Sequence, residues 1–438
     1  MKARLVPLYF KSARNEEFDE QLAQLRSLLA QEAEILEPVA VGCDIPDADA
    51  VIFPQLVGEA YRSIEHLQKI QIPILVVTSE FGTVAMWDWE IVTFLRSKGF
   101  NTFAPYKLEL TKTICRALAL KREMKNGKFL VYQDNPGDGM QASIFKRFYW
   151  WEDEWIDKIK DTFGIRIEKK SYKNLAQNAK HISDEEARNE WKNWNWPTQD
   201  LCEHSLFSAV KMYLAVKAEV EKDNEIIGVG INCLNESFHS DTTPCLAWNM
   251  LFEGKGIVWA CEADTLSLLN KFIIYKALKA PVMMSNLYPF LMGMAALKHE
   301  KIKEFPDVKE PENHILIAHC GYFGLVPKCF ASRWMLRPRV LEIVNDNAIA
   351  IDAEFPVGDV TLVEMHPTLT KILVTKGQLE RYVQYPGSDC RNGGLIKVED
   401  GYKIMNSLYS HHGCIVVGHK DVEMNLVAQV LGLDMEQL

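Results

Sequence analysis

The sequence lacks the features that mark several common classes of protein. Its ten cysteines include no Cys-x-x-Cys pair, which argues against a structural zinc site of the paired-cysteine kind. Positive charge is not in excess, because the formal net charge is −10, whereas nucleic-acid-binding proteins usually carry a basic footprint. No apolar stretch reaches the roughly 20 residues that a membrane-spanning helix needs. We therefore expect neither nucleic acid nor a membrane as a partner.

A secretory signal is also lacking, because the first apolar run is short and no small-residue cleavage site follows it. We expect a cytoplasmic protein whose cysteines are reduced and mostly buried thiols. The 438 residues favour two to four domains, at roughly 100–200 residues per domain. A hydrophobic content of 48% is ordinary for a globular protein and is sufficient for a sizeable core.

The N-terminal part alternates strand and helix patterns. Apolar strand candidates cover residues 3–9, 50–58 and 72–80, and apolar residues at helical spacing follow each of them. This alternation predicts a parallel sheet with helices on both faces. We place this first Rossmann-like domain at residues 1–122.

A second alternating region predicts the same architecture for residues 123–305. Its strand candidates include 226–234, 257–262 and 281–287, and helical patterns lie between them. Near its start, residues 128–140 lead from a strand into a glycine-containing loop. This loop could touch a ligand, since ligands bind at the carboxyl ends of parallel strands, or it could be an ordinary turn.

The pattern changes near residue 306. From there on, short strand candidates are separated by Gly, Pro and Asp, and a helical pattern covers residues 420–432. This indicates a mostly antiparallel β domain at residues 306–438. The predicted fold class is therefore α/β, with two doubly wound Rossmann-like domains followed by a C-terminal, mostly antiparallel β-barrel domain.

Potential metal ligands stand at the ends of apolar strand candidates. Glu262 ends one such run, where a charge is costly unless it is paired or coordinated. His319 ends another, and His411 and His412 precede a third. A carboxylate with imidazoles suits Mn, Fe, Co or Zn. Each histidine alone is more often a hydrogen-bonded structural residue, and the wide spacing does not decide between these readings.

Other polar residues are weaker candidates. Glu236 and His239 follow a strand candidate, where they could contact substrate or be solvated. His419 could contact substrate or cap the last helix. Cys320 lies beside His319, but a buried thiol is a better interpretation than a nucleophile.

The region from 226 to 438 resembles the L-fucose isomerase and L-arabinose isomerase superfamily. The matching stretches are residues 244–269, 315–321, 353–362 and 411–424. The resemblance implies two Rossmann-like domains followed by a β-barrel, a divalent metal that is commonly Mn²⁺, and interconversion of an aldose and a ketose. It also implies a homo-oligomer.

The resemblance extends to individual residues. Glu262 matches the catalytic metal-binding glutamate of the family, and His412 matches its C-terminal metal-binding histidine. His319 matches a further histidine that arabinose isomerases use at the metal.

One position departs from the family pattern. Where the family has its second catalytic carboxylate, this chain has Ser285 and Asn286. An asparagine can coordinate a metal through its amide oxygen, but it cannot act as a general base. Either Asp264 or Glu236 takes over this role, or the proton-transfer chemistry has changed or been lost.

These observations predict a metal-dependent aldose–ketose isomerase that acts on a monosaccharide or sugar derivative through an enediol. Glu262 is expected to be both base and ligand. His319 and His412 would hold the metal, with Asn286 as a neutral ligand or orienting group. The alternatives are an isomerase or epimerase for an unusual anionic sugar, and a non-catalytic sugar-binding protein with a decayed site.

Overall fold

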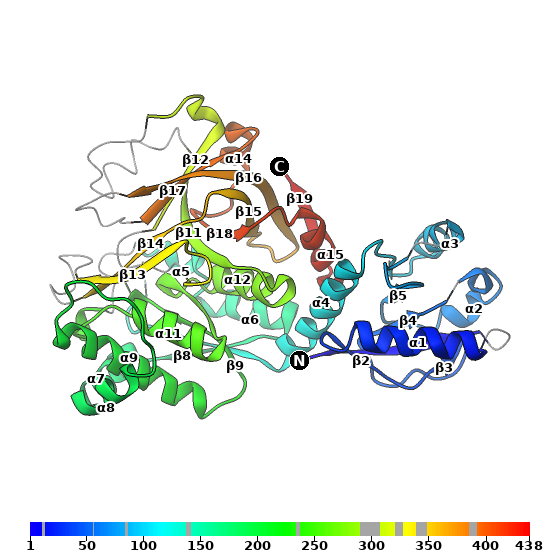
Figure 1. Ribbon diagram of the computed structural model, residues 1–438, viewed down its shortest axis with the longest axis horizontal. Coiled ribbons are helices and arrows are strands. Elements are labelled where there is room, and N and C mark those ends of the chain that lie inside the picture. The colour runs from blue at the N-terminus through cyan, green and yellow to red at the C-terminus, as the bar shows by residue number, and fades with distance from the viewer. Residues whose placement is uncertain are drawn as a thin grey trace. The chain divides into compact units, whose positions relative to one another are not determined.

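The chain folds into a mixed α/β structure, seen in the computed structural model of Figure 1. Contacts divide it into two compact units, one comprising Met1–Lys125, Lys276–Leu278 and Asn425–Leu433, and the other the remainder. The domain boundaries at residues 122 and 305 stay predictions. The structure describes residues 1–10, 14–55, 57–83, 86–136, 142–233, 237–289, 307–319, 327–338, 348–384 and 392–438.

The first unit contains a parallel sheet with the strand order β2-β1-β4-β5-β6, in which β3 also pairs with β1. Its strands are near-continuously apolar, as expected when both faces of a parallel sheet are covered. The strands are β1 (Ala3–Tyr9), β2 (Ala33–Ile35), β3 (Val39–Ala40), β4 (Ala50–Phe53), β5 (Ile74–Val76) and β6 (Thr102–Phe103). The helices are α1 (Glu16–Leu28), α2 (Ile64–Leu67), α3 (Met86–Ser97) and α4 (Leu108–Asn126), with the 3₁₀ turn η1 (Gly58–Tyr61).

The second unit contains a second parallel sheet, with the order β10-β9-β7-β8. Its strands are β7 (Lys128–Tyr132), β8 (Arg166–Lys170), β9 (Ile226–Ile231) and β10 (Val258–Ala260). The helices of this region are α5 (Phe145–Phe148), α6 (Asp153–Phe163), α7 (Tyr172–His181), α8 (Asp184–Trp191), α9 (Glu203–Glu221), α11 (Cys245–Lys255) and α12 (Thr265–Leu278). Within the described residues, no helix is long and apolar enough to cross a membrane.

The same unit contains a closed antiparallel β-barrel, which confirms the barrel predicted for the C-terminal region. Six strands follow one another in the order β15-β18-β11-β12-β17-β16, and pairing of β15 with β16 closes the ring. They are β11 (Val282–Pro289), β12 (His314–Ala318), β15 (Gly358–Met365), β16 (Lys371–Gln384), β17 (Asn392–Lys397) and β18 (His412–Val417). Outside the ring lie β13 (Arg333–Pro338), β14 (Ile349–Glu354), β19 (Asp434–Gln437) and α14 (Gly401–Ser407). Most of the last helix, α15 (Asp421–Leu431), belongs to the first unit.

Strand β11 corrects one expectation from the sequence. We expected residues 281–287 in the second parallel sheet, but β11 is antiparallel to both of its neighbours, β12 and β18, and belongs to the barrel. Its residues from Val282 to Leu287 are all buried. A strand that is buried on both faces shows no alternation of apolar and polar residues in either kind of sheet, so the sequence could not distinguish the two.

A Trp-rich segment that contains Trp191, Trp194 and Trp196 packs within the chain. The rings of Trp194 and Trp196 lie 4.7 Å apart, centroid to centroid. Trp194 also meets Tyr213 of α9 at 5.6 Å, and Trp196 meets Trp334 of β13 at 4.9 Å. These edge-on contacts support local packing as the role of the segment.

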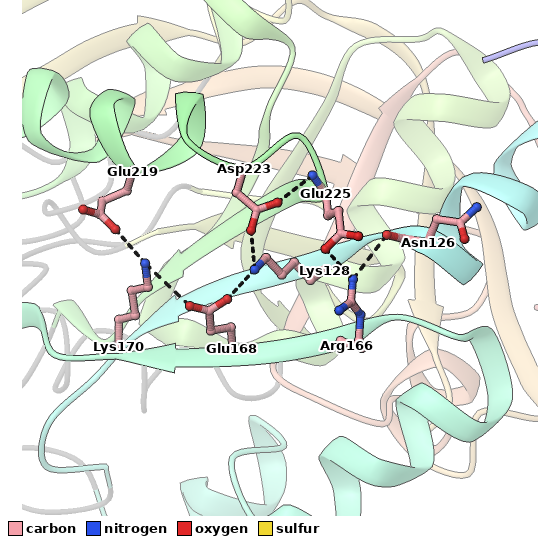
Figure 2. A network of polar contacts seen from close by, with 8 residues as sticks. All are labelled: Asn126, Lys128, Arg166, Glu168, Lys170, Glu219, Asp223 and Glu225. Atoms are coloured by element: carbon pink, nitrogen blue, oxygen red, sulfur yellow. Dashed lines mark hydrogen bonds and ion pairs between the residues drawn. The ribbon is translucent and has the colours of Figure 1, made fainter.

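A network of ion pairs lies along strand β8, at the edge of the second parallel sheet (Figure 2). Lys128 of β7 lies 2.5 Å from a carboxylate oxygen of Glu168 and 2.5 Å from one of Asp223. Lys170 lies 2.6 Å from Glu219. The hydrogen bond from Lys128 lowers the pKa of Glu168, which therefore stays ionised. Charged side chains on an edge strand discourage pairing with strands of other molecules.

Candidate metal centre

Three side chains that can bind a metal ion meet where β18 begins. Glu262, His411 and His412 each offer one ligand atom, and these atoms all lie within 4.8 Å of one another. Glu262 occupies the turn between β10 and α12, and the two histidines lead into β18. Glu262 and His412 are buried, whereas His411 is exposed. Carboxylate and imidazole groups suit first-row divalent cations, so this group can hold a metal ion.

The backbone at Glu262 adopts an unusual conformation. Glu262 has φ 56° and Ala263 has φ 55°, both in the left-handed region that residues other than glycine rarely adopt. Trp151 donates its indole N–H to the carbonyl of Ala263 at 2.7 Å. Thr265 donates its backbone N–H and its hydroxyl to the carbonyl of Tyr149, at 3.1 Å and 2.7 Å. A segment distant in sequence therefore holds the turn that carries Glu262.

The hydroxyl of Tyr149 contacts Glu262 directly. It donates to Oε2 of Glu262 at 2.5 Å. Burial first, and then the charge of Glu262, raise the pKa of Tyr149 well above its usual value, so the phenol keeps its proton. Nε2 of His411 lies 3.3 Å from the same hydroxyl. Since the hydroxyl gives its one proton to Glu262, it accepts from His411, which assigns a proton to Nε2 of that ring.

His412 is oriented by a carboxylate. Its Nδ1 lies 2.9 Å from Oδ2 of Asp264, to which it donates. Its Nε2 lies 3.7 Å from Oε1 of Glu262 and makes no hydrogen bond within the described part of the chain. Burial alone lowers the pKa of His412, but the hydrogen bond to Asp264 and the charges of Glu262 and Asp264 outweigh it and raise that pKa. A histidine held at one nitrogen by a carboxylate, with its other nitrogen lacking a partner, is typical of a metal ligand.

Two further predicted ligands lie beside His412. Asn286 of β11 stands directly opposite His412 of β18 and Ala318 of β12. Its side-chain N–H donates to the hydroxyl of Tyr288 at 3.1 Å, and its buried Oδ1 makes no hydrogen bond among the described residues. His319 follows Ala318, and its ring centroid lies 5.6 Å from that of His412. Burial lowers the pKa of His319 well below its usual value, which favours the neutral form that binds metals.

Of the four ligands predicted from the sequence, Glu262 and His412 belong to the close group, together with His411, while Asn286 and His319 neighbour His412. Asp264, considered from the sequence as a substitute base, instead forms the N-cap of α12 through Ser267 and holds His412. Tyr149 was not singled out from the sequence. Its only signal there is its place in an aromatic run, residues 148–151, which does not indicate contact with Glu262.

The weaker candidates do not all join this group. His239 ends the 3₁₀ turn η2 (Ser237–His239), which packs against α7. His419 lies beyond the other end of β18 from His412, with Nε2 3.3 Å from the carbonyl of Gly377. Glu236 and Cys320 lie outside the described residues.

The arrangement therefore offers a buried carboxylate, up to three imidazoles and an amide oxygen at one end of the barrel strands. Such a set can hold a divalent cation. No protein-family model matches the chain, and no curated protein is significantly similar to it.

Proposed function

We propose that this protein is a cytoplasmic, divalent-metal-dependent aldose–ketose isomerase for a monosaccharide or sugar derivative. The observation that carries the proposal is the buried pair of Glu262 and His412, in which Asp264 orients the imidazole and leaves its Nε2 without a hydrogen bond. The resemblance to L-fucose and L-arabinose isomerases implies a metal at these two residues. We also infer that both parallel sheets are doubly wound and Rossmann-like, as in that superfamily.

Glu262 and His412 would hold the ion, with His319 and Asn286 as further ligands. When bound there, a divalent cation polarises the substrate carbonyl and stabilises the developing enediolate oxygens. We propose Mn²⁺, as the resemblance implies, although the ligand set also suits Fe, Co and Zn.

Glu262 would carry both proton steps. Its carboxylate would take the proton from C2 of the open-chain aldose, so that the C–H electron pair forms the C1–C2 double bond and the carbonyl electrons move to O1. A proton then passes from the hydroxyl on C2 to O1, and the same carboxyl group returns its proton to C1, which gives the ketose with its carbonyl at C2. Asn286 cannot share this work because an amide is not a base at neutral pH. Asp264 is engaged with His412 and the start of α12.

The first test is the metal content of the purified protein, measured by elemental analysis and by titration with Mn²⁺. We expect about one ion per chain, lost in His412→Ala and retained in the matched control His419→Ala, whose imidazole lies beyond the far end of β18. Glu262→Gln should abolish isomerisation and leave the fold intact. A wild-type protein that takes up no divalent ion would contradict the proposal.

One observation favours a second candidate, an isomerase or epimerase for an anionic sugar. Asn286 is neutral where the family has a carboxylate, which lowers the negative charge that an anionic substrate would meet. A panel of neutral, phosphorylated and sulfonated sugars separates the two candidates. Sugar binding without turnover, whatever metal is supplied, would favour a non-catalytic sugar-binding protein.

We further propose that the protein is a homo-oligomer, which light scattering of the purified chain would test.

A further inference from the structure

We infer that Tyr149 is a positioning residue of the metal centre, whose hydroxyl holds one oxygen of Glu262 so that only the other oxygen is presented to the ion. The inference rests on the proposed function, because it concerns the same site. It makes Glu262 a ligand through a single oxygen, and the second lone pair of Oε2 would take part in the proposed proton transfer.

The two oxygens of Glu262 have different surroundings. Oε2 accepts the hydrogen bond from Tyr149 at 2.5 Å, and Oε1 faces Nε2 of His412 at 3.7 Å. Nε2 makes no hydrogen bond in the described part of the chain, and its ring donates from Nδ1 to Asp264, so Nε2 and Oε1 face each other as two electron-pair donors that an ion could join. Oε2 is already engaged by Tyr149.

Tyr149 touches both of these ligands. Its ring is stacked on the ring of His412, with centroids 5.4 Å apart and planes 11° from parallel. The ring of Tyr149 is also stacked on the ring of Phe145, with centroids 4.9 Å apart and planes 8° from parallel. The side chain is fully buried. The ring is held by these contacts independently of the hydroxyl, so the substitution Tyr149→Phe removes the hydrogen bond while keeping the packing.

The backbone contacts explain why such a device is needed. Glu262 and Ala263 both have positive φ, a conformation that persists only when neighbouring groups hold it. Tyr149 and Trp151 supply those groups. The carbonyl of Tyr149 accepts a hydrogen bond from Thr265, and the indole N–H of Trp151 donates to the carbonyl of Ala263. The segment therefore fixes the main chain of Glu262, and the hydroxyl of Tyr149 fixes its side chain.

Without the hydroxyl, Oε2 of Glu262 loses the hydrogen bond from Tyr149, so the carboxylate is held less firmly. Groups that orient metal ligands typically change metal affinity by about 10–100-fold when they are removed. We expect Tyr149→Phe to raise the Kd for Co²⁺ by a factor in this range. We also expect its visible Co²⁺ absorption spectrum to change, because the number or geometry of the ligand oxygens changes.

The experiment titrates the full-length protein with Co²⁺ by calorimetry and by visible absorption, in wild type, Tyr149→Phe and Tyr132→Phe. Tyr132 is the matched control, because it is also buried in the same unit and its hydroxyl makes no hydrogen bond within the described residues. We expect Tyr132→Phe to keep the wild-type Kd and spectrum. Thermal unfolding of each metal-free protein checks that the fold is retained.

A wild-type Kd and spectrum in Tyr149→Phe would overturn the inference and leave the proposed function standing. If wild type itself binds no divalent ion, the proposed function fails, and this inference fails with it. If Tyr149→Phe does not fold, wild-type protein carrying ¹³C at the hydroxyl-bearing ring carbon of tyrosine is titrated with Zn²⁺. One tyrosine resonance must then move, and the inference is wrong if none does.

Discussion

Replacing Asp264 by alanine removes a carboxylate that contacts both a helix and the proposed metal ligand His412. Oδ1 accepts from the backbone N–H of Ser267 at 2.9 Å, which caps α12. Oδ2 accepts from the hydroxyl of Ser267 at 2.7 Å and from Nδ1 of His412 at 2.9 Å. Asp264 is almost fully buried, so water cannot replace these contacts.

The size of the effect follows from these contacts. Loss of an N-cap costs about 1 kcal/mol in the free energy of unfolding. Loss of a hydrogen bond to a charged group costs about 1.5–3 kcal/mol. We therefore expect Asp264→Ala to lower the free energy of unfolding by about 2–4 kcal/mol. Metal affinity should fall about 10–100-fold, which corresponds to about 1.4–2.7 kcal/mol of binding free energy.

Urea unfolding and Co²⁺ titration measure the two effects separately. Asp400→Ala is the matched control, because Asp400 caps α14 by accepting from the backbone N–H of Lys403 at 2.9 Å. It should cost about 1 kcal/mol and leave the Kd for Co²⁺ unchanged. Asp264→Asn adds a sharper test. An amide can keep the cap, but it presents an N–H where His412 needs an acceptor, so affinity should fall with little loss of stability.

An Asp264→Ala variant that is no less stable than Asp400→Ala and that binds Co²⁺ with the wild-type Kd would contradict this prediction. Asp264 would then be a helix cap alone, and His412 would hold its orientation by packing.

Two buried ionisable groups, Glu364 and Lys271, should make the free energy of unfolding depend on pH. Burial raises the pKa of Glu364 to about 8, whereas the unfolded chain loses this proton near pH 4.3. The folded state thus binds the extra proton between these values, so stability falls as the pH rises from about 5 to 8. Glu364→Gln should remove this fall, as measured by urea unfolding at both pH values, and an unchanged slope would contradict the assignment. Lys271 is fully buried, with Nζ 3.2 Å from the ring centroid of Trp259 and without a hydrogen bond in the described part of the chain. Burial lowers its pKa to about 7, so the unfolded chain binds the extra proton and stability rises from pH 7 towards 10. Lys271→Met should stabilise the protein at pH 7 by on the order of 2 kcal/mol, and less at pH 9, in thermal unfolding; a less stable variant at pH 7 would count against this account.

Much of the architecture could be predicted because it is encoded locally. Alternating apolar runs and helical patterns predicted the parallel sheets, and short strands between Gly, Pro and Asp turns predicted the antiparallel barrel. Strand β11 was misassigned because burial on all sides leaves no alternation to read. Which strands pair is a long-range property, and a buried run such as Val282–Leu287 is compatible with several partners.

The candidate site was predictable to a smaller extent. Glu262, His319 and His412 attracted notice as polar residues at the ends of apolar runs, and the resemblance joined them with Asn286. The groups that orient these ligands left no such signal. Tyr149 meets Glu262 and Asp264 meets His412 across long stretches of chain, and no spacing rule connects residues that only the tertiary fold brings together.

The order of strands in the barrel has a consequence for how the protein is made. β18 is the last strand of the ring in the sequence, yet it lies between β15 and β11, which are both synthesised before it. A nascent chain that ends before β18 therefore has Glu262 and Asn286 but an open ring and no His412. Insertion of β18 closes the ring and delivers that imidazole in a single event, and such long-range pairing is slow relative to local folding. Uptake of a metal by the newly made chain should consequently report the completion of folding, and can be no faster than the arrival of this strand.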